Sequence, residues 1–291
     1  MAHRVAILVD APDWHTRRLA EAFAKLGAGA AVLSLRDCAF VLGEDGTGIA
    51  MPGFADALPD AVLVRTIAAG TFEQVTLRLG LLHALGRLGV PVINDARAIE
   101  CCVDKSMTSF LLHRAGIATP PTLASESAAQ AERWRAGTAA ELVAKPLFGS
   151  QGRGLMRLRQ GEASPPPEQY AGVHYLQRFV GRDAGWRDFR VMVIGGEPVA
   201  AMLRHGRSWV TNVRRGARCE AVATSGDLAA QSIAAAAAVG ADYAGVDLIE
   251  DEEGRLLVLE VNSMPAWQGL QGVAPCDLAA KLAAHVLGRI G

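Results

Sequence analysis

Residues 245–262 read GVDLIEDEEGRLLVLEVN, in which two largely apolar runs flank an acidic turn. Two such runs around a turn containing glycine are typical of a β-hairpin. Pairing of Glu250 with Arg255 across the turn places Asp247 opposite Val258. Because side chains alternate between the faces of a strand, one face is then apolar, with Val246, Leu248, Leu257, Leu259 and Val261. The other face carries Asp247, Glu260 and Asn262, and a shift of one residue would spoil this separation.

The polar face of this hairpin brings two carboxylates and an amide together. Hard oxygen ligands of this kind suit Mg²⁺, which is usually bound together with substrate phosphates. The hairpin therefore predicts a magnesium site. A solvated face with ordinary surface acids is the alternative, and the hairpin alone leaves it open.

A second feature is the glycine-rich stretch KPLFGSQGRG at residues 145–154, which follows an apolar run. Its three glycines allow backbone N–H groups to approach an anion closely. It is not a Walker A motif, because no Gly-Lys-Ser/Thr follows. Lys145 stands out because only four of the 29 basic residues are lysines, and lysine acts as a compact charge toward phosphate. The stretch predicts a phosphate-binding loop, with a flexible hairpin loop as the alternative.

A third feature is a local density of cations and amides along the expected middle hairpins. Its members are Arg190, Arg204, Arg207, Asn212, Arg214 and Arg215. Asp188 and Arg190 are two residues apart, so they share a face of their strand. The cluster suits an anionic substrate, and a solvated surface is the alternative.

Composition limits the class of protein. The 291 residues are 51% hydrophobic and 20% charged, which allows a full core and argues against disorder or a coiled coil. The formal net charge of -1 gives no indication of nucleic-acid binding. The five cysteines match no zinc or redox spacing, so reduced thiols are expected. No apolar run approaches the ~20 residues that cross a bilayer, and the first is too short for a signal peptide. We therefore expect a soluble cytoplasmic protein.

The order of expected elements changes along the chain. The first third alternates strands and helices, which favours a parallel sheet covered by helices. No G-x-G-x-x-G follows the first strand, so a dinucleotide site is not indicated. The rest contains hairpins at 189–204 and 245–261 with helices at 228–239 and 277–290, a pattern typical of an α+β fold.

Taken in order, five motifs resemble the ATP-grasp superfamily, and within it the RimK-like carboxylate–amine ligases. The matching segments are 94–105 with 115–120, 145–154, 176–180, 188–216 and 245–262. The resemblance covers roughly residues 94–290. It implies an N-terminal α/β pre-ATP-grasp (Rossmann-like) domain at 1–94, followed by α+β ATP-grasp domains. These would be a lid and central subdomain at 95–175, with the glycine-rich loop, and a C-terminal subdomain at 176–291, with the magnesium site.

The resemblance also implies roles for residues at matching positions. ATP would be bound by Lys105, Lys145, Gly149, Ser150, Gln151, Gly152, Gly154, Gln177, Arg178, Phe179, Val180, Asp188, Thr211 and Asn212. The two lysines would contact the phosphates, as would Thr211 and Asn212. The backbone of Arg178 and Phe179 would contact the adenine, and Asp188 would lie near the ribose. Mg²⁺ or Mn²⁺ would be held by Asp247, Glu260 and Asn262. The catalytic residues, facing the acyl phosphate and the carboxylate substrate, would be Arg190, Arg204 and Arg215.

The implied activity is an ADP-forming ligase that joins a carboxylate to an amine through an acyl phosphate. Its partners would be small-molecule carboxylate and amine substrates. Glutamate or another amino acid would be added to a small metabolite, such as a pterin- or furan-type cofactor precursor. No nucleic-acid or membrane partner is expected, and a homo-oligomer is left open. Addition of glutamate to a protein tail is one alternative, and a nucleotide-binding regulatory protein without turnover is another.

Three single residues, Arg178, Trp267 and His205, have further expected roles. Arg178 stands where the family usually carries an acidic residue in the adenine hinge. Trp267, just past Asn262, would either stack on a planar acceptor or pack in the core. His205 adjoins the arginines and would either receive the amine proton or serve a structural role.

Overall fold

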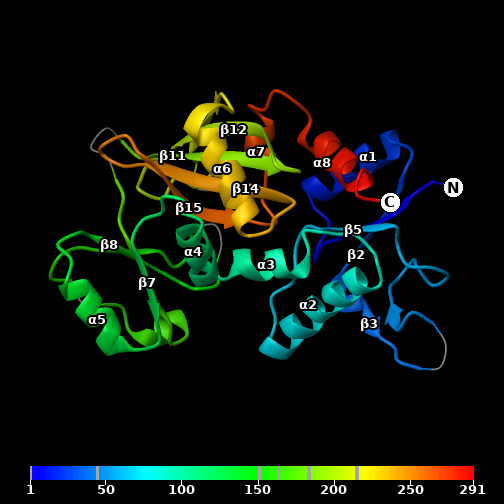
Figure 1. Ribbon diagram of the computed structural model, residues 1–291, viewed down its shortest axis with the longest axis horizontal. Coiled ribbons are helices and arrows are strands. Elements are labelled where there is room, and N and C mark those ends of the chain that lie inside the picture. The colour runs from blue at the N-terminus through cyan, green and yellow to red at the C-terminus, as the bar shows by residue number, and fades with distance from the viewer. Residues whose placement is uncertain (1, 44–45, 150–151, 163, 182–184, 214–215) are drawn as a thin grey trace.

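The computed structural model describes residues 2–43, 46–149, 152–162, 164–181, 185–213 and 216–291. Three groups of elements can be distinguished: an N-terminal α/β unit, a small sheet with α5, and a large sheet (Figure 1). Within the described ranges, no helix is both long and apolar enough to cross a membrane. This arrangement confirms the predicted fold class of an α/β unit followed by α+β units.

The N-terminal unit is a parallel sheet in the order β2-β1-β5-β6. Its elements are β1 (Arg4–Leu8), α1 (Trp14–Lys25), β2 (Gly29–Leu33), β5 (Ala61–Val64), α2 (Phe72–Arg87) and β6 (Val92–Ile93). The central strands β1 and β5 consist almost entirely of buried apolar residues, because elements pack on both faces of the sheet. The turn η1 (Leu35–Asp37) and a hairpin of β3 (Ala39–Phe40) and β4 (Ile49–Ala50) join β2 to β5. The sequence pattern did not predict that hairpin.

Two helices lead from this unit to the small sheet, namely α3 (Ala96–Val103) and α4 (Lys105–Arg114). The small sheet is antiparallel, in the order β7-β10-β8-β9. Its elements are β7 (Thr122–Ser125), α5 (Ala128–Ala136), β8 (Leu142–Lys145), β9 (Met156–Leu158), the turn η2 (Pro167–Tyr170) and β10 (His174–Arg178). Its core is a separate cluster that includes Ala131 of α5, Leu142, Leu158 and Leu176.

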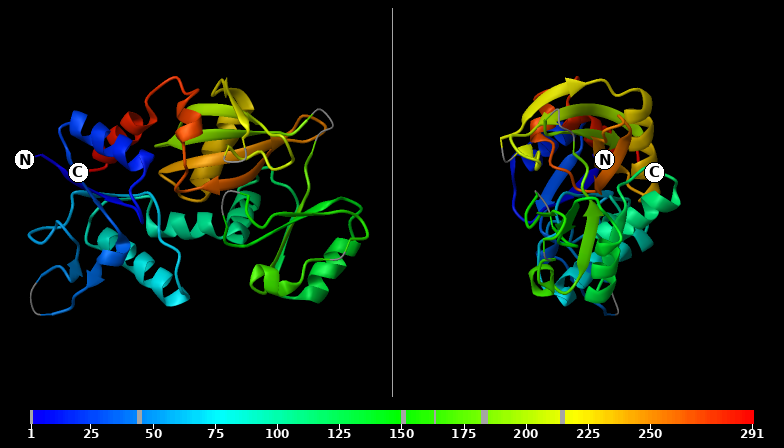
Figure 2. Two further views of the ribbon diagram at one scale, coloured as in Figure 1. Left: turned by 180° about the vertical axis from the view of Figure 1, so that it is seen from behind. Right: turned by 90° about the vertical axis from the view of Figure 1, so that its left-hand side faces the viewer.

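The large sheet is antiparallel, in the order β13-β12-β11-β14-β15. Its strands are β11 (Arg187–Ile194), β12 (Glu197–His205), β13 (Arg218–Val222), β14 (Tyr243–Glu250) and β15 (Leu256–Asn262). One face packs against α6 (Gly226–Ala238), α3 and α4 through a fully apolar cluster. The chain then forms α7 (Gln268–Gln271) and α8 (Leu278–Leu287). Figure 2 shows α8, at the C-terminal end, beside α1 of the N-terminal unit.

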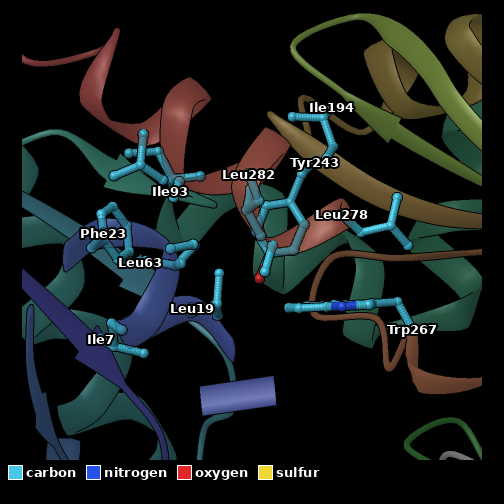
Figure 3. Close-up of a cluster of buried hydrophobic side chains, with 14 of the residues drawn as sticks. Ile7, Leu19, Phe23, Leu63, Ile93, Ile194, Tyr243, Trp267, Leu278 and Leu282 are labelled. Atoms are coloured by element: carbon cyan, nitrogen blue, oxygen red, sulfur yellow. The ribbon is translucent and has the colours of Figure 1, made fainter. Parts of the chain in front are cut away.

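The other face of the large sheet joins the N-terminal unit in one core (Figure 3). Ile7, Leu63 and Ile93 of the parallel sheet share this core with Ile194 and Tyr243 of the large sheet. Further along the same strands, this face becomes polar, because Asp188 and Arg190 alternate in phase with Met192 and Ile194. The N-terminal unit therefore lies beside the polar half of the large sheet.

The register of the β14–β15 hairpin differs from the prediction. Asp247 pairs with Glu260, not with Val258, and Glu250 pairs with Leu256, not with Arg255. The Asp251 carboxylate accepts a hydrogen bond of 2.8 Å from the Arg255 N–H and draws that residue into the turn. The register shifts again between Asp247 and Leu248, where a bulge leaves Leu259 unpaired.

These shifts change which residues face the core. Val258 is fully buried in the apolar cluster with Val246, Leu248 and Val261, whereas Leu257 and Leu259 lie outside that cluster. The predicted register was therefore wrong. The prediction that Asp247 and Glu260 share a face holds, because the bulge places these two carboxylates directly opposite each other.

Candidate active site

The centre of the site is the acidic pair on β14 and β15. Asp247 is 5% exposed and lies directly opposite Glu260. The Asn262 amide donates hydrogen bonds to the Glu260 carboxylate at 3.1 Å and to the Gly245 carbonyl at 3.3 Å. Both bonds use Nδ2, which points the Oδ1 atom of Asn262 away from these acceptors. The three predicted metal ligands are thus grouped at one end of the hairpin.

Two arginines hold the Asp247 carboxylate. Arg190, its cross-strand neighbour on β11, donates from Nε and Nη2 over 2.6 and 2.5 Å, and Nη2 of Arg204 lies 3.1 Å from Oδ1 of Asp247. Arg204 also donates to both oxygens of Asp188, over 2.8 and 2.5 Å. Burial alone would raise the pKa of Asp247, but Arg190 and Arg204 outweigh it and hold that pKa well below its usual range. Asp247 is therefore ionised at neutral pH.

The two singled-out lysines reach the site from different elements. Lys105, the first residue of α4, donates to the carbonyls of Leu147 and Gly149 over 3.1 and 2.9 Å. Lys145, the last residue of β8, donates to Gln177 over 2.6 Å. Burial lowers the pKa of Lys145 to about 8, although the Glu260 carboxylate opposes this shift. Burial also lowers the pKa of Lys105, again against the charge of Glu260. Both cations therefore lie within electrostatic reach of the acidic pair.

The glycine-rich loop has little room for side chains. A Cβ atom at Gly149 would lie 2.9 Å from Cγ of Pro146, and one at Gly152 would lie 2.7 Å from Val210. Gly152 and Gly154 also have φ angles of +67° and +69°, which glycine adopts readily. The loop thus passes close to the 206–213 connection after β12. The predicted residues Ser150, Gln151 and Arg215 lie outside the described residues.

The hinge residues are tied into the small sheet. The N–H of Arg178 donates to Pro121 and that of Phe179 donates to Glu141, each over 2.8 Å. These two N–H groups already have acceptors, so a contact to a base would use other backbone groups of the hinge. The Phe179 ring lies 3.9 Å from the Arg157 guanidinium and makes edge contacts with Trp186 and Trp209.

A cavity of about 50 Å³ opens between these aromatic rings and the acidic hairpin. It is lined by Val180, Trp186, Asp188, Trp209, Thr211 and Leu259, among others. Asn212 follows Thr211 in the same connection. A larger groove of about 330 Å³ shares Val180, Gly181 and Trp186 with this cavity and is bordered by Arg178 and the acidic turn Asp251–Glu253.

Three members of this region were not predicted from the sequence: Arg157, Trp186 and Trp209. Trp186 could have been found, since it lies two residues before Asp188 and so shares its face. The contacts of Arg157 and Trp209 come from distant segments and left no local pattern.

Trp267 and His205, the two other residues with expected roles, contact neighbouring side chains. Trp267 is 1% exposed, with the Arg65 guanidinium 4.4 Å above its ring and the His15 ring 4.6 Å away. Of its two expected roles, core packing is therefore the observed one, because a buried ring cannot meet an acceptor. His205 lies 3.2 Å from Glu220, an exposed acid on β13.

The kind of ligand atoms in the site determines which metal ion it suits. Among the described residues, no three His, Cys, Asp or Glu side chains gather as a metal cluster. The site instead offers Asp247, Glu260 and the amide oxygen of Asn262. Such a small, all-oxygen set fits Mg²⁺, which keeps substrate phosphates and waters as its other ligands.

Comparison with known families agrees with this geometry. Residues 102–286 match the RimK-like ATP-grasp domain, and residues 3–99 match the RimK PreATP-grasp domain. The chain belongs to the RimK-like ATP-grasp family. As a RimK-like protein it is an ATP-dependent ligase.

Two relatives of this RimK-like ligase are named as alpha-L-glutamate ligases. It is 36% identical to the tetrahydromethanopterin:alpha-L-glutamate ligase of Methanococcus maripaludis, over 75% of this chain and 76% of that one. It is 29% identical to the probable alpha-L-glutamate ligase 1 of Shewanella amazonensis, over 97% of this chain and 95% of the relative.

Solved structures share the fold of the RimK-like ligase. The ATP-grasp ligase PsnB, in complex with a precursor variant, Mg and ADP, has a TM-score of 0.78 and 23% identity, covering 99% of this chain and 98% of its own. D-cycloserine synthetase DcsG has a TM-score of 0.69 and 20% identity, covering 99% and 100%. At these identities the likeness speaks for the fold alone.

Proposed function

We propose that this RimK-like ligase activates a substrate carboxylate with ATP and joins it to the amine of an amino acid. The observation that carries the proposal is the Asp247–Glu260 pair, in which Asp247 is buried and Glu260 is half-buried, and which lies within electrostatic reach of Lys105 and Lys145. In such a site a bound metal cation balances the charge of the two carboxylates, and bound phosphates balance the charge of the two partly desolvated lysines. Such a site is suited to phosphoryl transfer.

Each side chain has a role in this scheme. Asp247, Glu260 and Asn262 hold Mg²⁺ or Mn²⁺, which offsets the charge of the phosphates when bound. Lys105 and Lys145 bind the phosphates of ATP beneath the glycine-rich loop. The base is placed against the hinge at Val180, with Asp188 on the ribose side.

Arg190 and Arg204 have different roles in this scheme. Arg190 faces the acyl phosphate and stabilises the charge that develops on the acyl oxygen. Arg204 is 5% exposed, and its guanidinium is occupied by Asp188 and Asp247. We therefore infer that Arg204 acts by holding these two carboxylates rather than by touching the substrate.

The reaction proceeds in two steps. The substrate carboxylate attacks the γ-phosphorus of ATP, its O–P bond forms as the bond to the β–γ bridging oxygen breaks, and ADP leaves. The amine nitrogen then attacks the acyl carbon, and its N–C bond forms as the bond from that carbon to the phosphate oxygen breaks. Phosphate leaves, and the nitrogen loses a proton to solvent. Positioning of the reactants supplies most of the rate in such a scheme. No protein nucleophile is required.

The substrate class follows from the relatives. Their names support L-glutamate as the amino acid, and that of the Methanococcus maripaludis relative supports a pterin-type carboxylate as its acceptor. We propose glutamate addition to a small carboxylate of this class in this chain as well.

The test is an assay of ADP release with ATP, Mg²⁺, L-glutamate and a panel of carboxylates, including pterin-type acids and glutamate-ended peptides. A carboxylate labelled with ¹⁸O should pass one labelled oxygen to the released phosphate. Absence of ADP release with every acid–amine pair, despite ATP binding, would contradict the ligase mechanism. Turnover with the peptides alone would instead overturn the small-molecule acceptor.

A further inference from the structure

The side chain of Asn94 joins both ends of the acidic hairpin to the N-terminal unit. Asn94 follows β6 and is completely buried. Its Nδ2 donates to the carbonyls of Tyr243 and Ser263 over 2.7 and 2.6 Å, and its Oδ1 accepts from the Tyr243 N–H over 3.1 Å. A single amide thus satisfies three backbone groups from two segments.

These two segments lead directly to the acidic pair. Tyr243 is the first residue of β14, the strand that carries Asp247, and Ser263 directly follows Asn262, the last residue of β15. A carbonyl held next to Asn262 limits the rotation of its backbone. Asn94 therefore constrains the position from which the Asn262 amide extends.

Arg65 makes a second connection from the same side. It follows β5 and is 4% exposed. Its guanidinium donates to the Pro265 carbonyl over 2.9 Å and to the Tyr243 hydroxyl over 3.2 Å, and it covers the Trp267 ring. Figure 3 shows Tyr243 and Trp267 near each other in the joint core. Together, Asn94 and Arg65 form what we call the clamp.

The clamped segment folds back against the site. A Cβ atom at Gly245 would lie only 2.8 Å from Cβ of Pro265, so this close approach requires glycine. Gly245 is also the cross-strand partner of Asn262 and accepts a hydrogen bond from its amide. A displacement of the Ser263–Pro265 backbone would therefore move Asn262 relative to Glu260.

We propose that Asn94 and Arg65 are positioning residues for the metal site, and that they set its affinity by fixing Asn262. The inference rests on the proposed metal role of Asp247, Glu260 and Asn262. Residues that orient metal ligands typically change metal affinity 10–100-fold when replaced. A purely structural connection between the two units would instead change stability and leave metal affinity unaltered.

The test measures Mn²⁺ binding to the ADP complex of the full chain, by electron paramagnetic resonance of the free ion. Asn94→Ala should raise the Kd for Mn²⁺ about tenfold, while ADP binding without metal, followed by calorimetry, stays within about twofold. Arg18→Ala is the matched control. It removes the 2.6 Å ion pair between α1 and Asp277, and so weakens the same junction away from the hairpin. Its Mn²⁺ affinity should equal that of the wild type.

A Kd for Mn²⁺ in Asn94→Ala within about twofold of the wild type would overturn the proposal. Should Asn94→Ala fail to fold, Arg65→Lys provides the second variant, because it keeps the charge but loses the planar fork that reaches both acceptors. It should weaken Mn²⁺ binding about tenfold, and a Kd within about twofold of the wild type would again overturn the proposal. A wild-type ADP complex that binds no Mn²⁺ would contradict the proposed metal site itself, so the two failures are distinguishable.

Discussion

Arg190 and Asp247 face each other across β11 and β14, and the guanidinium makes two hydrogen bonds of 2.6 and 2.5 Å to the carboxylate. The pair lies at the polar end of a sheet face whose other end is the joint core. A buried ion pair of this kind stabilises little by itself, since desolvation offsets the attraction between the charges. Its value here lies in keeping ionised an acid that is itself a proposed metal ligand.

Glu260→Gln should cut turnover about 100-fold or more while leaving the fold intact, because it removes a charge from the proposed metal site. Steady-state rates over a series of Mg²⁺ concentrations check this expectation. Glu220→Gln is the control, since Glu220 is an exposed acid on β13 that pairs with His205. Wild-type turnover of Glu260→Gln at saturating Mg²⁺ would rule out the metal role.

The Asp247→Asn substitution should make the free energy of unfolding depend less steeply on pH in the acidic range. The folded pKa of Asp247 lies below its ordinary value of 3.8, so the unfolded state binds the proton more readily. The stability that Asp247 contributes is therefore present above pH 3.8 and is lost as the pH falls toward the folded pKa. Urea unfolding between about pH 3 and pH 6 should give a shallower decline for Asp247→Asn than for the wild type.

The exposed acid Glu252 provides the comparison for this measurement. The free energy of unfolding of Glu252→Gln should decline with falling pH as that of the wild type does. Equal slopes for Asp247→Asn and the wild type would show that the two arginines do not shift the titration of Asp247.

Binding of ATP should take up a proton at alkaline pH through Lys145. Its folded pKa is lowered from 10.5 to about 8, so part of it is neutral at pH 8.5, and added phosphates favour the charged form. Calorimetry in buffers of different ionisation enthalpy should detect this uptake. Lys145→Arg should abolish it, because arginine remains charged. Equal uptake in both proteins would assign the proton to another group.

The same shift has a consequence for folding. Because the unfolded chain holds the Lys145 proton up to its ordinary value of 10.5, the contribution of this residue to stability rises as the pH increases from about 8 toward 10.5. The rise should be missing in Lys145→Arg when unfolding is measured across this range.

Gly152→Ala should raise the KM for ATP several-fold. Its φ of +67° disfavours a side chain, and the new Cβ would lie 2.7 Å from Val210, so the loop must move away from the 206–213 connection. Gly161→Ala separates the two effects, because its φ is +84° but no atom lies within 4 Å of the new Cβ. Both variants should lose about 1 kcal/mol of stability. An equal KM for ATP in both variants would contradict the proposal that the glycine-rich loop covers the ATP phosphates.

Much of the site was predictable because its residues follow local rules. Asp247, Glu260 and Asn262 were grouped by strand alternation, and Lys145 by its place beside a glycine-rich loop. The register was not predictable in the same way. It depends on the Asp251 side chain in the turn and on a bulge at Leu259, and neither leaves a pattern in a sequence that reads as a regular hairpin.

The sequence by itself determined the order of units, the acidic face of the last hairpin and the glycine-rich loop, since each depends on neighbours within a few residues. The tertiary structure alone decided that Trp267 is buried, that Arg204 holds two carboxylates, and that Asn94 binds the strand ends next to the proposed metal site. Asn94 and Tyr243 are 149 residues apart. Contacts at such separations form only when whole units pack, because the joint core brings the N-terminal sheet against the large one.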